Sequence, residues 1–189
     1  MQFNSIHFLV FFPVVLLIYF IVPKKLRYIW LLGASYYFYM SWNMEYAILI
    51  AFSTLVTYLS SIIINMFDDE SGKSGKFMRK FTLGFGITVN LAILFMFKYL
   101  GFAIDNLNLI LDKVGIEIVE TEFSLLLPVG ISFYTFQALG YVIDVYGKKV
   151  KVEYNLFKYA LFVSFFPQLV AGAFERAAKL LNSIKNTDK

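Results

Sequence analysis

The sequence contains no cysteine, a single histidine and few charged residues. Only 16% of its 189 residues are Asp, Glu, Lys or Arg, whereas about a quarter of a soluble domain is charged. The absence of cysteine excludes disulfides, thiolate nucleophiles and cysteine-ligated metals. A single histidine, His7, cannot form a multi-histidine zinc site. The sequence therefore predicts no metal site.

His7 is also the one residue of the type that most often serves as a general base. It lies at the start of the first apolar run, with no carboxylate near it in the sequence to orient the ring. Histidine commonly occupies the polar boundary of a membrane helix. We interpret His7 as an interfacial residue and predict no catalytic residue in this chain.

Apolar residues are abundant. The chain is 59% hydrophobic, with 22 Phe and 13 Tyr, and its mean hydropathy is +0.68. This exceeds what one small water-soluble core needs, so we predict an integral membrane protein in contact with the lipid bilayer. The net charge of +4 is interpreted as membrane topology, because the basic residues cluster between apolar runs. No nucleic-acid partner is expected.

Six apolar runs predict an all-α, polytopic bundle of transmembrane helices. The first five are long enough for about five spans. The sixth has 16 residues with Pro167 in its middle, so we expect a re-entrant or interfacial helix that is surrounded by protein or water. Residues 1–189 would form a single membrane domain with a polar tail at 177–189. The six runs cover residues 3–22, 28–44, 46–67, 81–97, 123–143 and 159–174.

The basic residues predict the sidedness of this bundle. Loops 23–27, 68–80 and 147–158 hold eleven of the seventeen Lys and Arg residues, so the positive-inside rule makes these loops cytoplasmic and the N-terminus external. The mixed segment 98–122 is then an extracytoplasmic amphipathic helix and loop. If the sixth run crossed the membrane, the four basic residues that follow it would lie outside, which also favours a re-entrant segment. These residues are Arg176, Lys179, Lys185 and Lys189.

Two segments carry a family resemblance. Residues 126–144 read Leu-Leu-Pro-Val-Gly-Ile-Ser-Phe-Tyr-Thr-Phe-Gln-Ala-Leu-Gly-Tyr-Val-Ile-Asp, and residues 164–172 read Ser-Phe-Phe-Pro-Gln-Leu-Val-Ala-Gly. Together with residues 3–13 and 31–42, they resemble the membrane-bound O-acyltransferase family, in its bacterial branch of alginate O-acetylation and D-alanyl transfer proteins. The resemblance runs in order from residue 3 to about residue 176.

The resemblance implies the reaction and its setting. The expected enzyme transfers an acyl group, with acetyl preferred to D-alanyl, to a hydroxyl of a cell-surface polysaccharide. The donor would be acetyl-CoA or an acyl-carrier thioester, which is a substrate, so no bound cofactor is expected. The implied partners are a carrier protein and an extracytoplasmic acyl-transfer protein, and the implied location is the bacterial plasma membrane.

The length of the chain qualifies this expectation. In the family, the histidine implicated in catalysis lies in the second half of a much longer chain, and nothing here matches that position. The resemblance therefore implies the N-terminal portion of the family's domain, inactive by itself. An alternative is a non-catalytic membrane scaffold or partner subunit of an acyl-transfer complex. Half of a transporter is a third hypothesis, although transporter halves show paired broken helices and only one end of this chain is broken.

One candidate site lies on a helix expected over 131–146. Tyr134, Gln137, Tyr141 and Asp144 are spaced by three, four and three residues, which places them on one stripe. Two interpretations remain open. The stripe could be a polar wall of an acyl-donor tunnel, or Gln137 and Tyr141 could bond to neighbouring helices while Asp144 pairs with a basic loop residue.

A second candidate group is Ser164, Gln168 and Arg176. The family commonly reads Gly-Pro, a hydrophobic residue, an acid and Arg at this point, whereas this chain reads Gly172-Ala-Phe-Glu-Arg176. Replacing the proline by alanine frees the backbone φ and restores an N–H donor. Arg176 would then guide an anionic donor or anchor in lipid head groups.

Overall fold

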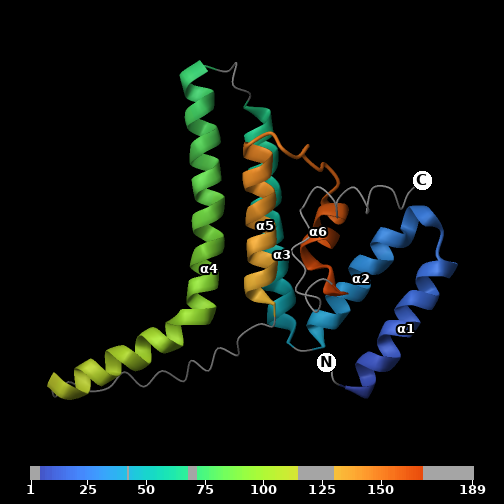
Figure 1. Cartoon of the computed structure of the whole chain (residues 1–189), viewed down its shortest axis with the longest axis horizontal. Helices are drawn as coiled ribbons and strands as arrows, with labels where there is room; N and C mark the ends of the chain where they lie inside the picture. Colours follow the sequence, from blue (N-terminus) through green and yellow to red (C-terminus); the bar gives the residue numbers. More distant parts are fainter. Residues whose placement is uncertain (1–4, 42, 68–71, 115–129, 168–189) are drawn as a thin grey trace.

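The computed structural model describes residues 5–41, 43–67, 72–114 and 130–167, and all regular structure in these ranges is helical (Figure 1). The predicted all-α class is therefore confirmed for this part of the chain. The elements are α1 (Ile6–Ile21), a 3-10 turn η1 (Lys24–Leu26), α2 (Arg27–Met40), α3 (Met44–Met66), α4 (Gly72–Val114), α5 (Ile131–Tyr146) and α6 (Leu156–Ser164).

Side-chain caps define where three of these helices begin. The Ser5 hydroxyl accepts from the Phe8 N–H at the start of α1, and Asn43 Oδ1 accepts from the Glu45 N–H at the start of α3. Asn155 Oδ1 accepts from the N–H groups of Phe157 and Lys158 in the first turn of α6. Each cap supplies an acceptor to donors that have no partner within the helix. At the start of α5, Gly130 takes a left-handed backbone with φ of 82°, a conformation that favours glycine.

Helix α3 forms the centre of the arrangement. It packs against α5 and α4 on one side and against α2 and α6 on the other, while α1 packs outside α2. Figure 1 shows that α1, α3 and α5 run in one direction and that α2 and α4 run in the other. The ends of α1, α3 and α5 therefore lie towards the same end of the bundle, as the predicted sidedness requires. Which side of a membrane this end faces stays a prediction.

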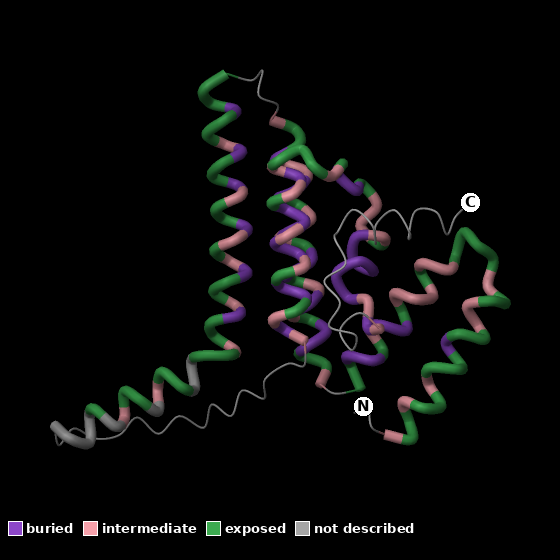
Figure 2. The backbone as a smooth tube through the Cα atoms, in the orientation of Figure 1, coloured by how far each residue is buried: buried purple, intermediate pink, exposed green. Residues whose placement is uncertain are grey.

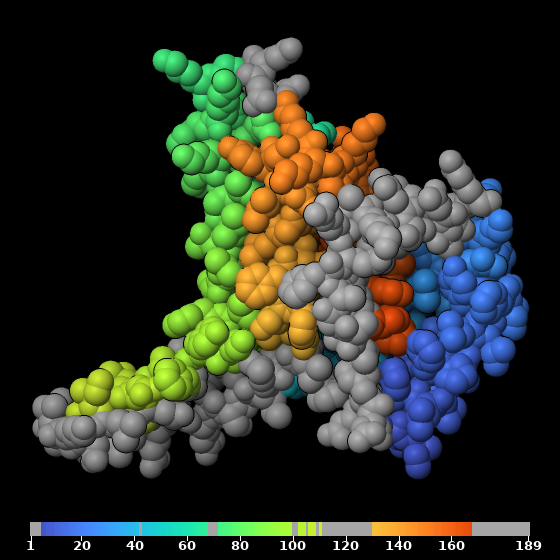
Figure 3. Space-filling model, viewed as in Figure 1, coloured from blue at the N-terminus to red at the C-terminus, as the bar shows by residue number. Residues whose placement is uncertain are grey.

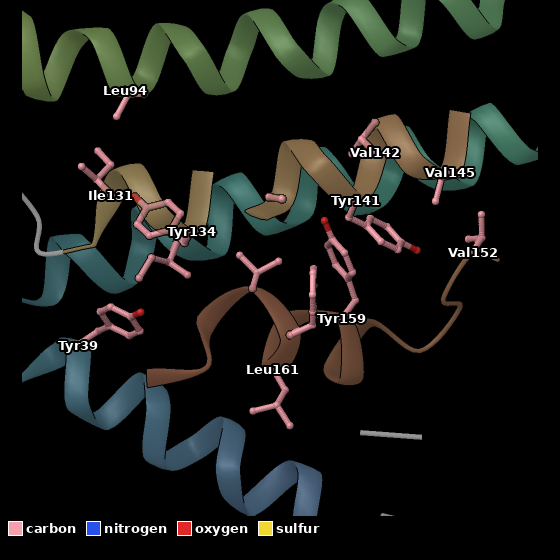
Figure 4. Close-up of a cluster of buried hydrophobic side chains, with 14 of the residues drawn as sticks. Tyr39, Leu94, Ile131, Tyr134, Tyr141, Val142, Val145, Val152, Tyr159 and Leu161 are labelled. Atoms are coloured by element: carbon pink, nitrogen blue, oxygen red, sulfur yellow. The ribbon is translucent and has the colours of Figure 1, made fainter. Parts of the chain in front are cut away.

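The buried side chains form two clusters. The larger joins α2, α3, α4, α5 and α6, and Tyr134, Tyr141 and Tyr159 are fully buried in it (Figure 4). The smaller is aromatic and surrounds Phe166, whose ring lies 5.6 Å from the rings of both Phe11 and Phe38. Such ring pairs add to the burial energy. The smaller cluster thus fixes the segment after α6 against α1 and α2.

Apolar side chains cover much of the outer surface. Figure 2 shows α4 buried along the side that faces α3 and α5 and exposed on the other. Two helices are long and apolar enough to cross a membrane, Met44–Met66 and residues Gly72–Tyr99 of α4, and Ile6–Ile21 is a shorter apolar helix. By length and apolar composition, the described residues hold two helices that could cross a membrane. The predicted count of about five spans stays a proposal.

Two of the expected boundaries differ from the structure. Residues 68–80 were expected as a loop because of their Gly, Ser and Lys content, yet the chain is helical from Gly72 onward. Lys and Arg are good helix formers, and Arg79 is anchored to α5 by a hydrogen bond to the Tyr146 carbonyl. The fourth run therefore continues upstream as helix instead of ending in a loop.

The other difference concerns the sixth run. Its helix begins earlier than predicted, at Leu156, and ends at Ser164, with Phe165 in an extended conformation ahead of Pro167. Proline cannot supply the N–H that a continuing helix would need. Residues 168–174 and the tail 177–189 lie outside the described residues, so a re-entrant path stays a prediction. In the segment 98–122, α4 continues to Val114 and bends away from the bundle (Figure 1), and residues 115–122 lie outside the described part.

Candidate functional site

The predicted stripe lies on α5, as expected from its spacing. Tyr134 and Tyr141 have no exposed surface, and Gln137 and Asp144 are half-buried. Figure 4 shows the two tyrosines on the side of α5 that faces α6 and α2. The hydrogen bonds of these residues decide what each can contribute to a site.

Gln137 connects α5 to the end of α6. Its Nε2 donates to the backbone carbonyl oxygen of Phe162 at 2.7 Å. The last four carbonyls of a helix lack partners within the helix, and Phe162 is among them because α6 ends at Ser164. Gln137 therefore satisfies a carbonyl that the break before Pro167 leaves open, which matches the packing interpretation for this residue.

Tyr141 connects α5 to the segment that follows it. Its hydroxyl oxygen accepts from the Glu153 N–H at 2.8 Å, and its ring lies 4.8 Å from the ring of Tyr159 and 5.9 Å from that of Phe162. Both contacts position α6 relative to α5. The hydrogen bond of Tyr141 therefore goes to the segment between α5 and α6 and not to a neighbouring helix, while its ring packs against α6.

A chain of hydrogen bonds between buried polar groups connects α6, α3 and α4, and the sequence did not reveal it. The Tyr159 hydroxyl of α6 donates to Thr57 Oγ1 of α3 at 2.8 Å, and Thr57 donates to the Ser53 carbonyl at 2.8 Å. The Ser53 hydroxyl donates to Asn90 Oδ1 of α4, and Asn90 Nδ2 donates to the Gly86 carbonyl at 2.9 Å. The signal in the sequence was the helical spacing of small polar residues in the third apolar run, at positions 53, 57, 60 and 61.

The hydroxyl groups of Tyr39 and Tyr134 behave differently. Both are buried, and within the described residues neither has a hydrogen-bond partner. Tyr39 belongs to α2 and Tyr134 to the first turn of α5, and both lie towards the same end of the buried cluster in Figure 4. A buried hydroxyl without a partner is costly, so these two groups could still bind a polar ligand or water. The same holds for Thr54 Oγ1 of α3, which is also buried and without a partner among the described residues.

Of the other four predicted site residues, the structure describes Ser164 and Asp144. Ser164 is fully buried, and its hydroxyl donates to the Ala160 carbonyl at 2.8 Å, a bond within its own helix. The backbone carbonyl of Asp144 accepts from the Lys149 N–H at 2.8 Å, and the predicted pairing of its carboxylate stays open. Gln168 and Arg176 lie outside the described residues, so their roles stay predictions.

The described residues hold no group of side chains that could bind a metal. Among them, no three His, Cys, Asp or Glu side chains gather as a metal site would require. His7 is exposed in the first turn of α1. What the described site offers is a set of buried hydroxyl and amide groups from five helices, α2 to α6, suited to binding and positioning.

The sequence matches curated proteins over nearly its full length. It is 37% identical over 188 residues to the probable alginate O-acetylase AlgI of Pseudomonas putida, covering 98% of this chain and 37% of that protein. The AlgI protein of Pseudomonas aeruginosa is 36% identical over 98% of this chain and 35% of its own length. The chain belongs to the membrane-bound O-acyltransferase family. Within that family it falls in the alginate O-acetylation branch, as the motifs predicted.

A third relative comes from another genus. The peptidoglycan O-acetyltransferase of Helicobacter pylori is 30% identical over 205 residues, covering 93% of this chain and 37% of that protein. The chain thus spans about a third of the length of the curated relatives that it matches. No family model and no solved structure matches the chain.

Proposed function

We propose that this chain is part of a membrane-bound O-acetyltransferase that acetylates hydroxyl groups of a cell-surface polysaccharide. The observation that carries the proposal is the match to alginate O-acetylases over 98% of the chain. The Helicobacter relative is also named as an O-acetyltransferase, for peptidoglycan. The relatives therefore share the acetyl group and differ in the polymer that their names give.

The reaction has simple requirements. The acceptor hydroxyl oxygen attacks the carbonyl carbon of the donor thioester, an ester bond forms, and the carbon–sulfur bond breaks with release of the thiol. A base must take the hydroxyl proton, and a positioned base contributes about 10²–10⁴ in rate. Within the described residues the single histidine is exposed at the start of α1. We propose that the base comes from another part of the protein.

The proposed contribution of this chain is the bundle around the donor. Tyr134, with its open hydroxyl, is proposed as a polar contact of an acetyl-CoA or acyl-carrier thioester, while Gln137 and Tyr141 position α6 beside it. Ser164, Gln168 and Arg176 remain proposed contributors. The proposed setting is the bacterial plasma membrane, with several spans, a carrier protein on the cytoplasmic side and an acyl-transfer partner outside. The two membrane-capable helices support a membrane setting.

A chimeric enzyme tests the proposal. The segment of the Pseudomonas putida AlgI protein that matches this chain is replaced by the matching residues of this chain, and alginate acetylation is measured in cells that lack their own AlgI. We expect acetylated alginate from the chimera, at a level above cells that carry an empty vector. A chimera that is inserted in the membrane at normal abundance and yields no acetylation would contradict the proposal. If the chain instead raised acetylation only when expressed beside an intact AlgI, the partner-subunit alternative would replace it.

A further inference from the structure

An open cavity of about 400 Å³ lies at the end of the bundle where α3 and α5 end and the early part of α4 passes. Figure 1 shows this end at the top, and Figure 3 shows side chains of α4 and of the segment after α5 side by side there. The cavity is independent of the stripe on α5. Its lining residues are Ile64, Asn65, Phe67, Arg79, Val145, Lys148, Val150 and Lys151.

The lining combines positive charge with an apolar wall. Arg79, Lys148 and Lys151 come from two separate parts of the chain, and none of the eight lining residues is acidic. Among the described residues, Asp144 and Glu153 are the acids closest along the chain to Lys148 and Lys151, and neither lines the cavity. The acids that follow Phe67, at positions 68–70, lie outside the described residues. The Glu153 carboxylate accepts from the Asn155 N–H at 3.1 Å. Three cations around one hollow attract an anion.

The cavity wall is held by specific bonds. Arg79 is 6% exposed, its guanidinium donates to the Tyr146 carbonyl at 2.8 Å, and it lies 5.1 Å from the centre of the Tyr146 ring. Lys148 takes a left-handed backbone with φ of 58°, and its N–H donates to the Val145 carbonyl at 3.0 Å. A left-handed conformation is uncommon outside glycine. The turn therefore fixes the direction in which the chain, and with it Lys148 and Lys151, leaves α5.

Helix capping explains part of this arrangement. The carboxyl ends of α3 and α5 carry partial negative charge, which favours nearby cations, and Arg79 caps α5 directly. Capping does not require an open volume between three cations. The four apolar lining residues, Ile64, Phe67, Val145 and Val150, are also unexplained by capping, although they suit a ligand that has a charged head and an apolar body.

We propose that this cavity binds the phosphate group of an anionic phospholipid, with Arg79, Lys148 and Lys151 around the phosphate and the apolar wall against the glycerol and upper acyl chain. The position fits, because the cavity lies at the end of α3, which is long enough to cross the bilayer and so ends near the head groups. Basic pockets between membrane helices recognise lipid head groups in this way. A soluble phosphate compound has the same chemistry and is the alternative source that the experiment must separate.

The experiment measures lipid-dependent thermal stability of the full 189-residue chain in a neutral detergent. Phosphatidylglycerol, phosphatidylcholine or inorganic phosphate is titrated, and the concentration that gives half of the rise in Tm is recorded. The test variant is K148Q/K151Q, which leaves the structural bond of Arg79 intact. The control variant is K80Q/K149Q, which removes two charges from exposed lysines at the same end of the bundle that do not line the cavity.

We expect phosphatidylglycerol to raise Tm of the unaltered chain and phosphatidylcholine to do so much less. In K148Q/K151Q the half-effect concentration of phosphatidylglycerol should rise by about tenfold or more, since each basic residue near a membrane surface contributes several-fold to anionic lipid binding. The control should stay near the unaltered value. If K148Q/K151Q has a lower Tm without lipid, the single variant K151Q is used, and it should still raise the half-effect concentration by several-fold.

Three results would overturn the proposal: equal effects of the two lipids, equal losses in the test and control variants, or no change in K148Q/K151Q. Competition of millimolar inorganic phosphate against phosphatidylglycerol would support the phosphate site. A rise in Tm with inorganic phosphate alone, with no response to phosphatidylglycerol, would overturn the lipid as the ligand.

Discussion

Gly86 tests how closely α3 and α4 approach. It is buried on the face of α4 that packs against α3, and a Cβ atom added there would lie 2.9 Å from Ser60 Oγ and 3.4 Å from Ser60 Cβ. Gly84 lies in the same helix on the exposed side, where an added Cβ would have no atom within 4 Å. The pair therefore separates the effect of helix propensity from the effect of close packing.

The expected magnitudes follow from these two terms. Alanine is favoured over glycine in a helix by about 1 kcal/mol, and both substitutions receive this gain. Only Gly86→Ala adds a methyl group to a filled interface, which costs about 1–3 kcal/mol. The clash is with Ser60 Oγ, since 3.4 Å from Cβ is an ordinary van der Waals separation. Ser60 is buried, so turning its hydroxyl away from the new methyl group displaces other packed atoms. We expect Gly84→Ala to stabilise the chain and Gly86→Ala to be less stable than Gly84→Ala by about 1–3 kcal/mol.

The assay is equilibrium unfolding in mixed detergent micelles with increasing sodium dodecyl sulfate, followed by tryptophan fluorescence. Ser60→Gly combined with Gly86→Ala removes both contacting atoms and should recover most of the interface term. Ser60→Ala removes the clashing Oγ and should recover a similar amount. Equal stability of Gly84→Ala and Gly86→Ala would refute the close approach of the two helices, and so would the absence of any rescue by Ser60→Gly.

Three further outcomes are expected. Tyr159→Phe should lower the free energy of unfolding by about 0.6 kcal/mol, the average for a hydrogen bond between membrane helices, whereas Tyr159→Ala should lower it several times more. A double-mutant cycle with Thr57→Val in the same assay should show a coupling energy between the two residues. A coupling energy of zero would mean that the bond does not form. The isolated chain should transfer no acetyl group above background, and His7→Ala should leave the chimera's acetylation nearly unchanged; turnover by the short chain that His7→Ala abolishes would refute both. Single cysteines at Ser74 and Asn108 should react with an impermeant maleimide from opposite sides of the membrane, and labelling of both from outside would contradict the predicted sidedness.

Local patterns predicted the helices well and their ends less well. The third run, expected at 46–67, is α3 from Met44 to Met66, and the small offset comes from Asn43, whose capping role is evident only once its side chain is seen to accept the Glu45 N–H. The spacing on 131–146 correctly predicted one helix with its stripe of polar residues. In the segment 72–80, Gly and Ser suggested a loop, but contact between Arg79 and the end of α5 favours helix. That contact joins residues 67 positions apart, which no local pattern reveals.

The same limit applies to the site. The sequence identified Gln137 and Tyr141 as polar residues in an apolar run, and the structure adds their partners, the Phe162 carbonyl and the Glu153 N–H. The bond between Tyr159 and Thr57 spans 102 positions, so its members appeared in the sequence as unrelated small polar residues. Periodicity shows which face of a helix is polar. It does not show which helix that face meets.

The buried polar face of α3 has a physical reason in a membrane protein. Lipid chains are as apolar as leucine, so moving apolar side chains from lipid into a helix interface yields little free energy. Association of the helices therefore depends on close packing of small residues and on hydrogen bonds between helices. Ser53, Thr57 and Ser60 of α3 supply both, because each is small enough for close approach and two of them bond to α4 or α6. A buried hydroxyl that bonds to another helix therefore stabilises the association of the two helices. Tyr39 and Tyr134 have no such partner within the described residues, so contacts between the described helices do not account for their hydroxyl groups. This agrees with the polar donor contact proposed above for Tyr134.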